Sequence, residues 1–225
     1  MNRRPLWVLL IAIACVAGGI AADRLVVSSK WGSAQADPTA YSSWRHRVRH
    51  FETLTGAPEV VMLGDSLTDL AEWPELLGPT VANRGISGDT TGGLRQRLKA
   101  SVPASARTVV IMIGTNDLKP ANWRLEDSVA NVSAILDGLK GRRVILQSVL
   151  YTADAKQNAR IDRLNQAYAR LCVPGRCEWL DLNPIVAPQG RLTSADSLDG
   201  RHLTGLAYQR WAAALRARLM PSPPR

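Results

Sequence analysis

Short apolar runs alternate with amphipathic stretches along most of the chain. The apolar runs, rich in β-branched residues, predict strands over residues 60–63, 80–83, 108–113, 143–150 and 178–182. Apolar residues at helical spacing predict helices over 94–102, 129–139, 161–171 and 204–219, with Thr204 as the N-cap of the last. Strands and helices that alternate in this way predict an α/β fold with a parallel sheet and helices on both faces.

The N-terminal segment has a different pattern. Arg3 and Arg4 precede residues 6–22, which contain no charged side chain. The apolar region of a cleaved signal peptide has roughly 7–15 residues, and a membrane-spanning helix needs about 20. The segment lies between these lengths, so both alternatives stay open, and we favour an uncleaved anchor. Both place the chain after Asp23 outside the cytoplasm, in the periplasm or at the extracellular face.

The chain therefore divides into three parts. Residues 1–27 form the signal peptide or membrane anchor, and residues 28–40 form a linker without hydrophobic periodicity. Residues 41–225 form one domain, which is long enough to bury a sizeable core. This domain begins with an amphipathic helix over 41–54, whose polar side is basic.

Composition and charge limit the classes of protein to consider. The chain of 225 residues is 46% hydrophobic, which excludes a disordered or fibrous protein, and it carries a formal net charge of +9. It has no basic repeat interleaved with aromatic residues and no zinc-ligand spacing, so nucleic acid is not an expected partner. The basic side of helix 41–54 suits a solvated face or, alternatively, anionic headgroups beside the anchor. His46 and His50 lack a third ligand nearby, so we expect surface histidines rather than a metal site.

Two cysteines flank a turn near the C-terminal third of the chain. Cys172 and Cys177 enclose the turn sequence Val-Pro-Gly-Arg. In an exported domain this arrangement favours a disulfide, because the compartment is oxidising. The alternative is a pair of buried thiols. With Cys15 in the apolar N-terminal segment, a disulfide leaves no odd thiol in the exported part.

The first predicted strand ends at Gly64-Asp65-Ser66, which places a serine hydroxyl at the carboxyl end of a parallel strand. Open α/β sheets carry their chemistry at this edge. Alone, such a triplet more often caps a helix than supplies a nucleophile. A serine nucleophile also needs a base, and His202 is the one histidine beyond the basic helix. Asp199 precedes it by three residues, so its carboxylate can hold one ring nitrogen while the other faces Ser66.

Two further loops are predicted at the same edge of the sheet. Serine chemistry on a carbonyl needs hydrogen-bond donors for the oxygen that becomes negative. The loop after the second strand contains Gly85, where a glycine lets a backbone N–H approach the substrate closely. The loop after the third strand contains Asn116, which offers a side-chain amide. Each feature is common by itself, so the prediction depends on their joint occurrence.

From residue 60 to residue 219 the chain resembles the SGNH, or GDSL-type, hydrolase superfamily. The blocks of this superfamily are similar to Gly64-Asp65-Ser66-Leu67, Gly85, Gly114-Thr115-Asn116-Asp117, and Asp199 with His202. The branch of platelet-activating-factor acetylhydrolase-like proteins and bacterial carbohydrate O-acetylesterases looks similar at 73–76, 83–91, Tyr208 and Trp211. Ala207 stands where this branch commonly has glycine.

The resemblance implies a site, a mechanism and a sheet order. It implies Ser66 as the nucleophile, His202 as the base and Asp199 as the group that orients the base. It implies an oxyanion hole made by the N–H groups of Ser66 and Gly85 and the amide of Asn116. It also implies a flavodoxin-like three-layer αβα sandwich, whose five-stranded parallel sheet has the order 2-1-3-4-5. No metal or other cofactor is implied.

The expected function is hydrolysis of short-chain acyl esters, above all acetyl esters, of a small molecule or a glycan. Compact predicted loops without a long apolar insertion favour short acyl groups over long ones. The alternatives are a lysophospholipase or lipase activity, an acyl transfer to a sugar, and a non-catalytic glycan-binding module. An α/β-hydrolase is disfavoured because the chain lacks Gly-x-Ser-x-Gly.

Overall fold

The computed structural model describes residues 37–119 and 122–219, and its compact unit begins at Asp37. The predicted anchor at 6–22, and with it all of residues 1–27, lies outside the described residues. The elements, in chain order, are η1 Pro38–Ala40, α2 Ser42–Thr53, β1 Val60–Gly64, α3 Ser66–Asp69, α4 Trp73–Leu77, β2 Val81–Gly85, α5 Thr91–Gln96, α6 Leu98–Ser101, β3 Thr108–Met112, α7 Leu125–Gly138, β4 Arg143–Gln147, α8 Ala155–Leu171, β5 Glu178–Leu180, α9 Asn183–Val186 and α10 Gly205–Leu219.

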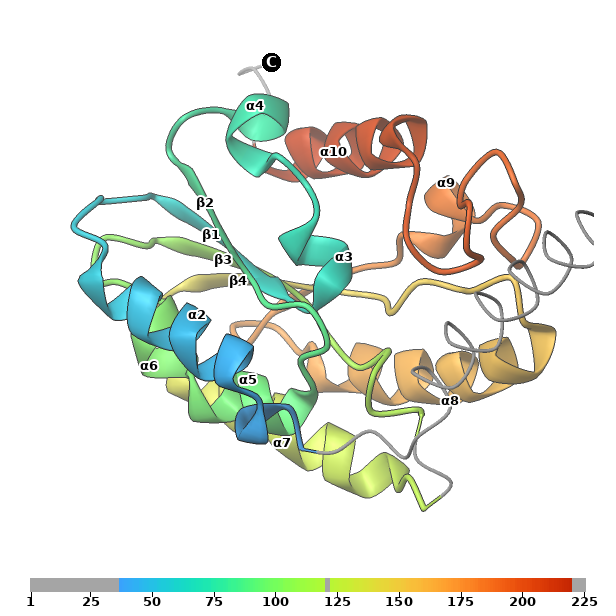
Figure 1. Ribbon diagram of the computed structural model, residues 1–225, viewed down its shortest axis with the longest axis horizontal. Coiled ribbons are helices and arrows are strands. Elements are labelled where there is room, and N and C mark those ends of the chain that lie inside the picture. Colours follow the sequence, from blue (N-terminus) through green and yellow to red (C-terminus); the bar gives the residue numbers. More distant parts are fainter. Residues whose placement is uncertain (1–36, 120–121, 220–225) are drawn as a thin grey trace, which may run out of the picture. The chain divides into compact units, whose positions relative to one another are not determined.

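The described strands form one parallel sheet in the order β2-β1-β3-β4-β5. This confirms the predicted α/β fold and the sheet order 2-1-3-4-5. Strand β1 lies between β2 and β3, and its last residue, Gly64, pairs with Gly85 on one side and Met112 on the other. Helices cover both faces of the sheet (Figure 1). The carboxyl ends of the strands therefore meet at one edge, as the site prediction requires.

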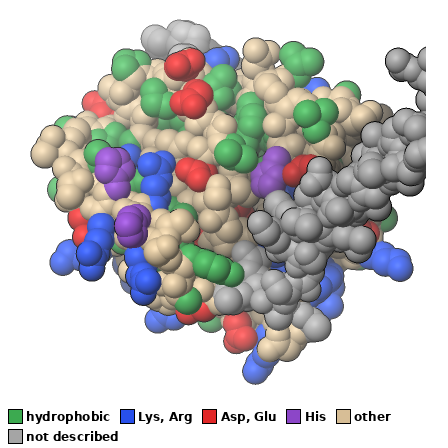
Figure 2. Space-filling view, in the orientation of Figure 1, with side chains coloured by type: hydrophobic (Ala, Val, Ile, Leu, Met, Phe, Trp, Pro, Cys, Tyr) green, Lys and Arg blue, Asp and Glu red, His purple; other side chains and the backbone are tan. Residues whose placement is uncertain are grey.

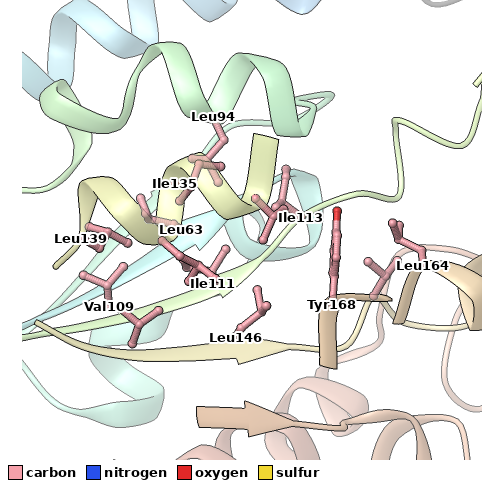
Figure 3. Packing of buried hydrophobic residues seen from close by; sticks show 14 of the residues in the cluster. Leu63, Leu94, Val109, Ile111, Ile113, Ile135, Leu139, Leu146, Leu164 and Tyr168 are labelled. Carbon is pink, nitrogen blue, oxygen red and sulfur yellow. The ribbon is translucent and has the colours of Figure 1, made fainter. Parts of the chain in front are cut away.

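Alternate residues of the strands belong to two separate hydrophobic cores, one on each face of the sheet. On one face, strand residues pack against α5, α7 and α8, and Figure 3 shows Ile135 and Leu139 over Leu63, Val109 and Ile111. On the other face, strand residues pack against α4, α9 and α10, with Trp73, Tyr208 and Trp211 in edge and stacked ring contacts. A third, smaller cluster joins Trp44 and Phe51 of α2 to Ile86. The sheet is thus buried on both sides, as a parallel sheet requires.

The predicted helix over 94–102 is wrong in one respect, because the structure divides it into α5 and α6 at Arg97. The Arg97 guanidinium is buried, and it donates to Asp89 and Gly64, which lie outside both helices; the backbone of Arg97 departs from helical angles, with φ of −93° and ψ of 6°. The short helices α3, α4 and α9 were not predicted, since a single turn contains too few residues to show helical periodicity. The last helix begins after Thr204, whose hydroxyl accepts from the Ala207 N–H, as an N-cap does.

Two further predictions concern the ends of the domain and the cysteines. Residues 37–40 of the predicted linker are structured, since η1 forms there and Pro38 is buried. No helix among the described residues has the length and hydrophobicity to cross a membrane. Cys172 and Cys177 are joined by a disulfide of 2.11 Å, which links the C-terminal end of α8 to the start of β5.

Candidate active site

Ser66 is the first residue of α3, directly after the central strand β1. Asp65 caps this short helix, because its Oδ1 accepts from the Leu67 N–H at 3.0 Å. Gly64 is required before it, since a Cβ there would lie 2.1 Å from Thr68 Oγ1 and 2.4 Å from the Met112 carbonyl oxygen. The Ser66 N–H, at the first position of α3, donates to no other described residue. The chain thus presents both the hydroxyl and the N–H of Ser66 at the carboxyl edge of the sheet.

His202 and Asp199 lie on one tight loop before α10. An isolated antiparallel bridge between Ser197 and Leu203 closes this loop at its base. Within it, His202 Nδ1 lies 2.6 Å from Asp199 Oδ2, and the His202 N–H donates to Asp199 Oδ1 at 2.8 Å. His202 Nε2 lies 3.0 Å from Ser66 Oγ. The structure therefore brings the three predicted residues into one hydrogen-bonded chain.

Asp199 is held in its ionised form. Partial burial acts to raise the pKa of Asp199, but hydrogen bonds from the His202 ring and from the N–H groups of His202 and Arg201 outweigh it. They hold the pKa of this carboxyl well below its usual range. An ionised Asp199 favours the tautomer of His202 with its proton on Nδ1, which leaves Nε2 able to accept a proton from Ser66.

Asn116 follows β3 and is fixed to the neighbouring loop. Its Nδ2 donates to the Asp89 carbonyl oxygen at 2.8 Å, and the residue is 4% exposed. The loop that contains Asp89 is in turn held to the nucleophile strand, because the Ile86 N–H donates to the Gly64 carbonyl at 3.1 Å. Asn116 is therefore tied, through Asp89 and Ile86, to the residue that lies two positions before Ser66.

Gly85 does not lie in a loop, contrary to the sequence prediction. Strand β2 extends to residue 85, and the N–H of Gly85 donates to Asn83 Oδ1 at 2.9 Å. A Cβ at Gly85 would lie 2.2 Å from the Asp69 nitrogen, so the glycine is needed for contact with α3. Its N–H is engaged, which argues against the predicted role of Gly85 as an oxyanion donor. Gly88, with φ of 81°, is the glycine that adjoins Asp89 in the following loop.

Polar contacts that sequence reasoning missed hold α3 in place. Asn83 Nδ2 donates to the carbonyl oxygens of Thr68, Asp69 and Ala71, so it satisfies the C-terminal end of α3. Asp69 accepts from both the N–H and the hydroxyl of Ser87. These contacts join α3 to β2 and to the loop after it. No local pattern signals them, since each joins residues at least twelve positions apart.

Asp65 is a buried carboxyl immediately before Ser66. It is 1% exposed, and its Oδ2 has no hydrogen-bond partner among the described residues. Burial, together with the charges of Asp89 and Asp117, raises the pKa of Asp65 to about 7, against the Leu67 N–H and Lys119, which lower it. Burial and the nearby Arg201 lower the pKa of Lys119 to about 8. Sequence reasoning did not predict an acidic group with a pKa near neutrality at this position.

The surface around the site is mixed in chemistry. Figure 2 shows a histidine against a carboxylate between α3 and the loop before α10, and further histidine and basic side chains over α2 on the same face. Within the two described ranges, no group of three or more His, Cys, Asp or Glu side chains could hold a metal ion.

Comparison with known proteins gives a family match. Residues 62–210 match the family model described as "GDSL-like Lipase/Acylhydrolase family". This range includes the end of β1, the Ser66 helix and the loop that carries Asp199 and His202. A sequence comparison with curated proteins found no match.

Solved structures with the same fold come from several bacteria. A protein from Streptococcus pneumonia described as a platelet activating factor has 22% identity and a TM-score of 0.73, and the alignment covers 88% of this chain and 99% of that one. A GDSL-like lipase from Bacteroides thetaiotaomicron has 23% identity and a TM-score of 0.66, with 78% and 96% covered. A catalytic mutant of an acetylxylan esterase from Geobacillus stearothermophilus has 18% identity and a TM-score of 0.63, with 75% and 97% covered. At these identities the likeness is one of fold.

Proposed function

This chain belongs to the GDSL-like lipase/acylhydrolase family and is a carboxylic-ester hydrolase, and from that premise we propose that it hydrolyses short-chain acyl esters with Ser66 as the nucleophile. The observation that carries the proposal is the hydrogen-bonded chain from Ser66 Oγ through the His202 ring to the Asp199 carboxylate. A serine hydroxyl is a weak nucleophile unless a base takes its proton, and this chain supplies the base and the group that orients it.

In the first half of the reaction, His202 Nε2 takes the proton of Ser66 as Oγ attacks the ester carbonyl. The ionised Asp199 stabilises the imidazolium that forms. The tetrahedral intermediate then collapses, the alcohol leaves with the proton from His202, and the acyl group stays on Ser66. In the second half, water gives a proton to His202 and attacks the acyl group, which releases the acid and the free serine.

The oxyanion hole in this proposal combines three donors. The N–H of Ser66 and the side-chain amide of Asn116 keep the roles that the sequence predicts. We assign the third donor to the 86–90 loop around Gly88 in place of Gly85. Support comes from the engaged N–H of Gly85 and from the Asp89 carbonyl, next to Gly88, which holds the Asn116 amide. Donors fixed in this way need no rearrangement when charge develops on the oxygen.

Short acyl groups, with acetyl first among them, are the proposed substrates. The sequence contains no long apolar insertion between the strands and the helices that follow them, as enclosure of an extended acyl chain would require. The fold is also that of an acetylxylan esterase, which makes an acetylated glycan a reasonable ester to test. The acyl group and the alcohol are both parts of the proposal.

A panel of p-nitrophenyl esters tests this function. The full chain should hydrolyse the acetate and butyrate esters faster than the laurate ester, and Ser66→Ala should abolish turnover of all three. Gln substituted at the exposed Ile185, on α9 and outside the proposed mechanism, serves as a control that keeps activity. Wild-type turnover by Ser66→Ala would refute the mechanism, and a preference for laurate would refute the proposed acyl length.

A longer acyl chain is the second candidate, because apolar side chains are exposed close in sequence to the proposed catalytic residues. Leu198, which precedes Asp199, is 93% exposed, and Leu70, which follows α3, is 56% exposed. A lipid ester would contact such side chains and bury their surface. Faster hydrolysis of laurate, together with its loss in Leu198→Ser, would support this candidate.

Export of the chain is also proposed, with residues 6–22 as a membrane anchor. The disulfide Cys172–Cys177 supports an oxidising compartment such as the periplasm or the extracellular face. Residues 1–27 fused to a reporter enzyme that is active only outside the cytoplasm would test it. A fusion whose reporter stays inactive would refute export, and release of the reporter from the membrane fraction would indicate cleavage instead of anchoring.

A further inference from the structure

A buried polar hub, made by Asp89, Arg97 and Trp44, contacts the proposed oxyanion donor Asn116, and Asp89 is its centre. This residue is 0% exposed. Its Oδ2 accepts from Arg97 Nε at 2.7 Å, and its Oδ1 accepts from the indole Nε1 of Trp44 at 3.0 Å. Its own carbonyl oxygen accepts from Asn116 Nδ2 at 2.8 Å. The groups that fix the Asp89 carboxylate therefore also fix the carbonyl that holds Asn116.

Arg97 connects this hub to two strands of the sheet. Its side chain is fully buried, as is that of Asp89. The guanidinium donates to the Gly64 carbonyl at 2.9 Å, the Arg84 carbonyl at 2.8 Å and Ser101 Oγ at 2.9 Å. Gly64 ends the strand that leads to Ser66, so one cation joins the nucleophile strand to the loop of Asp89. A buried ion pair with this many further hydrogen bonds is satisfied on both sides.

Helix α2 covers the ion pair from outside the family match, which begins at residue 62. Trp44 is 8% exposed and donates the indole bond to Asp89, while Phe51 is 4% exposed. The Phe51 ring faces the guanidinium groups of Arg84 and Arg97 at 5.1 and 5.8 Å. Water is thereby kept from the pair, which strengthens the electrostatic interaction inside it.

We infer that Trp44 is a positioning residue for ester hydrolysis, which holds the Asn116 amide in place through Asp89. The inference rests on the proposed function, since Asn116 matters to the rate only if it stabilises the oxyanion. Trp44 touches neither Ser66 nor His202 in the contacts that the structure describes. Its effect is transmitted by one residue, Asp89, whose side chain it binds and whose carbonyl orients the donor.

Trp44→Phe is the informative substitution, because it keeps an aromatic ring in the cluster with Phe51 and Ile86 and removes the N–H to Asp89. Substitution of Arg97 or Asp89 would instead leave a buried charge unpaired and threaten the fold. A displaced donor lowers the rate of the chemical step and leaves substrate binding largely unchanged. We therefore expect kcat on p-nitrophenyl acetate to fall roughly tenfold in the full chain, with KM within about twofold.

A double-mutant cycle with Asn116→Ala separates positioning from stability. When the amide is absent, Trp44→Phe should change kcat by less than about twofold, because its path to the oxyanion has gone. Ile135→Val, a change in the core under α7, should leave kcat unaltered in both backgrounds. Trp44→His, which keeps a ring N–H, should recover part of the kcat lost in Trp44→Phe.

Each outcome decides between the inference and its alternatives. An unchanged kcat in Trp44→Phe, or an equal loss with and without Asn116, would overturn the inference while the esterase function stands. Full activity of Ser66→Ala would instead refute the proposed function itself. If circular dichroism shows that Trp44→Phe is unfolded, Trp44→Tyr replaces it in the same cycle, since it keeps a larger aromatic ring and also lacks the indole N–H to Asp89. A kcat loss in Trp44→Tyr that persists in the Asn116→Ala background would then overturn the inference.

Discussion

At the scale of single residues, two buried aspartates near Ser66 have opposite surroundings. Asp89 faces a guanidinium and an indole N–H, so its charge has partners. Asp65 has one backbone N–H on Oδ1, and its Oδ2 has no partner within the described ranges. The sequence shows an Asp in both places and cannot tell them apart, because the partners come from distant parts of the chain. Burial raises the pKa of both carboxyls; at Asp89 the guanidinium and the indole N–H oppose this rise, whereas the pKa of Asp65 reaches about 7.

The raised pKa of Asp65 predicts a stability that depends on pH. In the folded protein this carboxyl titrates at about 7, and when unfolded near 3.8, so the folded state binds the additional proton between these values. The free energy of unfolding should then fall as the pH rises through this window. Asp65→Asn removes the titration and keeps an oxygen to cap α3. We expect the variant to be more stable than wild type at pH 8, by on the order of 1–4 kcal/mol.

Urea unfolding of both proteins at pH 5 and pH 8 measures this difference. The slope of stability against pH should be smaller in the Asp65→Asn variant. Asp154→Asn, at the N-cap of α8, is a matched control, because this carboxyl is exposed and also accepts from a backbone N–H of the helix that it caps. Equal slopes in wild type and Asp65→Asn would show that Asp65 is ionised throughout.

The role of Asn116 gives a second prediction at this scale. Its amide is buried and fixed by the Asp89 carbonyl, so Asn116→Ala removes one donor from the proposed oxyanion hole. Loss of one such donor costs about 10²–10³ in kcat. Steady-state kinetics on p-nitrophenyl acetate measure it, and a variant with kcat within a few-fold of wild type would exclude Asn116 from the hole.

At the scale of elements, the hydrophobic pattern was sufficient for the long helices and all the strands. It located the helix over 204–219 and its N-cap Thr204 because both depend on neighbours in sequence. It failed at Arg97, where a polar side chain turns inward to bind Gly64 and Asp89. It also failed at Gly85, which lies in strand β2 and not in the predicted loop, because the strand is longer than predicted. These failures have one physical cause, namely tertiary hydrogen bonds that override local preference.

The disulfide between α8 and β5 gives a prediction for these elements. It lies at the amino end of β5, while the candidate active site is at the carboxyl edge of the sheet. Closing a loop of this length stabilises the folded state by about 2 kcal/mol. The double variant Cys172→Ser/Cys177→Ser should lose about this much in a urea titration, with kcat unaltered. A large fall in kcat at temperatures where the variant is folded would contradict it.

At the scale of the whole molecule, the site depends on contacts between the two ends of the described chain. Ser66 and His202 are 136 positions apart. The last helix, α10, is fixed to the region of the nucleophile, since Tyr208 OH donates to the Leu67 carbonyl and Arg216 donates to the Leu76 carbonyl. The sequence predicted that the ends of the strands would meet, from parallel topology alone. It did not reveal which side chains fasten α10 there.

Tyr208→Phe tests this long-range fastening. The hydroxyl bond to the Leu67 carbonyl is buried, and burial raises the pKa of Tyr208 above its ordinary value, so the group is a neutral donor. Its removal leaves a buried carbonyl unpaired and should cost about 1–3 kcal/mol. A shift of the urea midpoint with an unchanged slope measures the loss. Tyr41→Phe, at an exposed tyrosine, is the matched control, and equal midpoints for both variants would refute the role of Tyr208.

The loop closed by the bridge between Ser197 and Leu203 contains both the imidazole and its carboxylate partner, so their mutual geometry is set within a handful of covalent bonds. Their distance to the serine, in contrast, is set by every layer of the protein. In the proposed mechanism, the rate of hydrolysis would therefore depend on intact tertiary packing. Any event that loosens the last helix would move Asp199 and His202, still bonded to each other, away from Ser66, and hydrolysis would stop before secondary structure is lost.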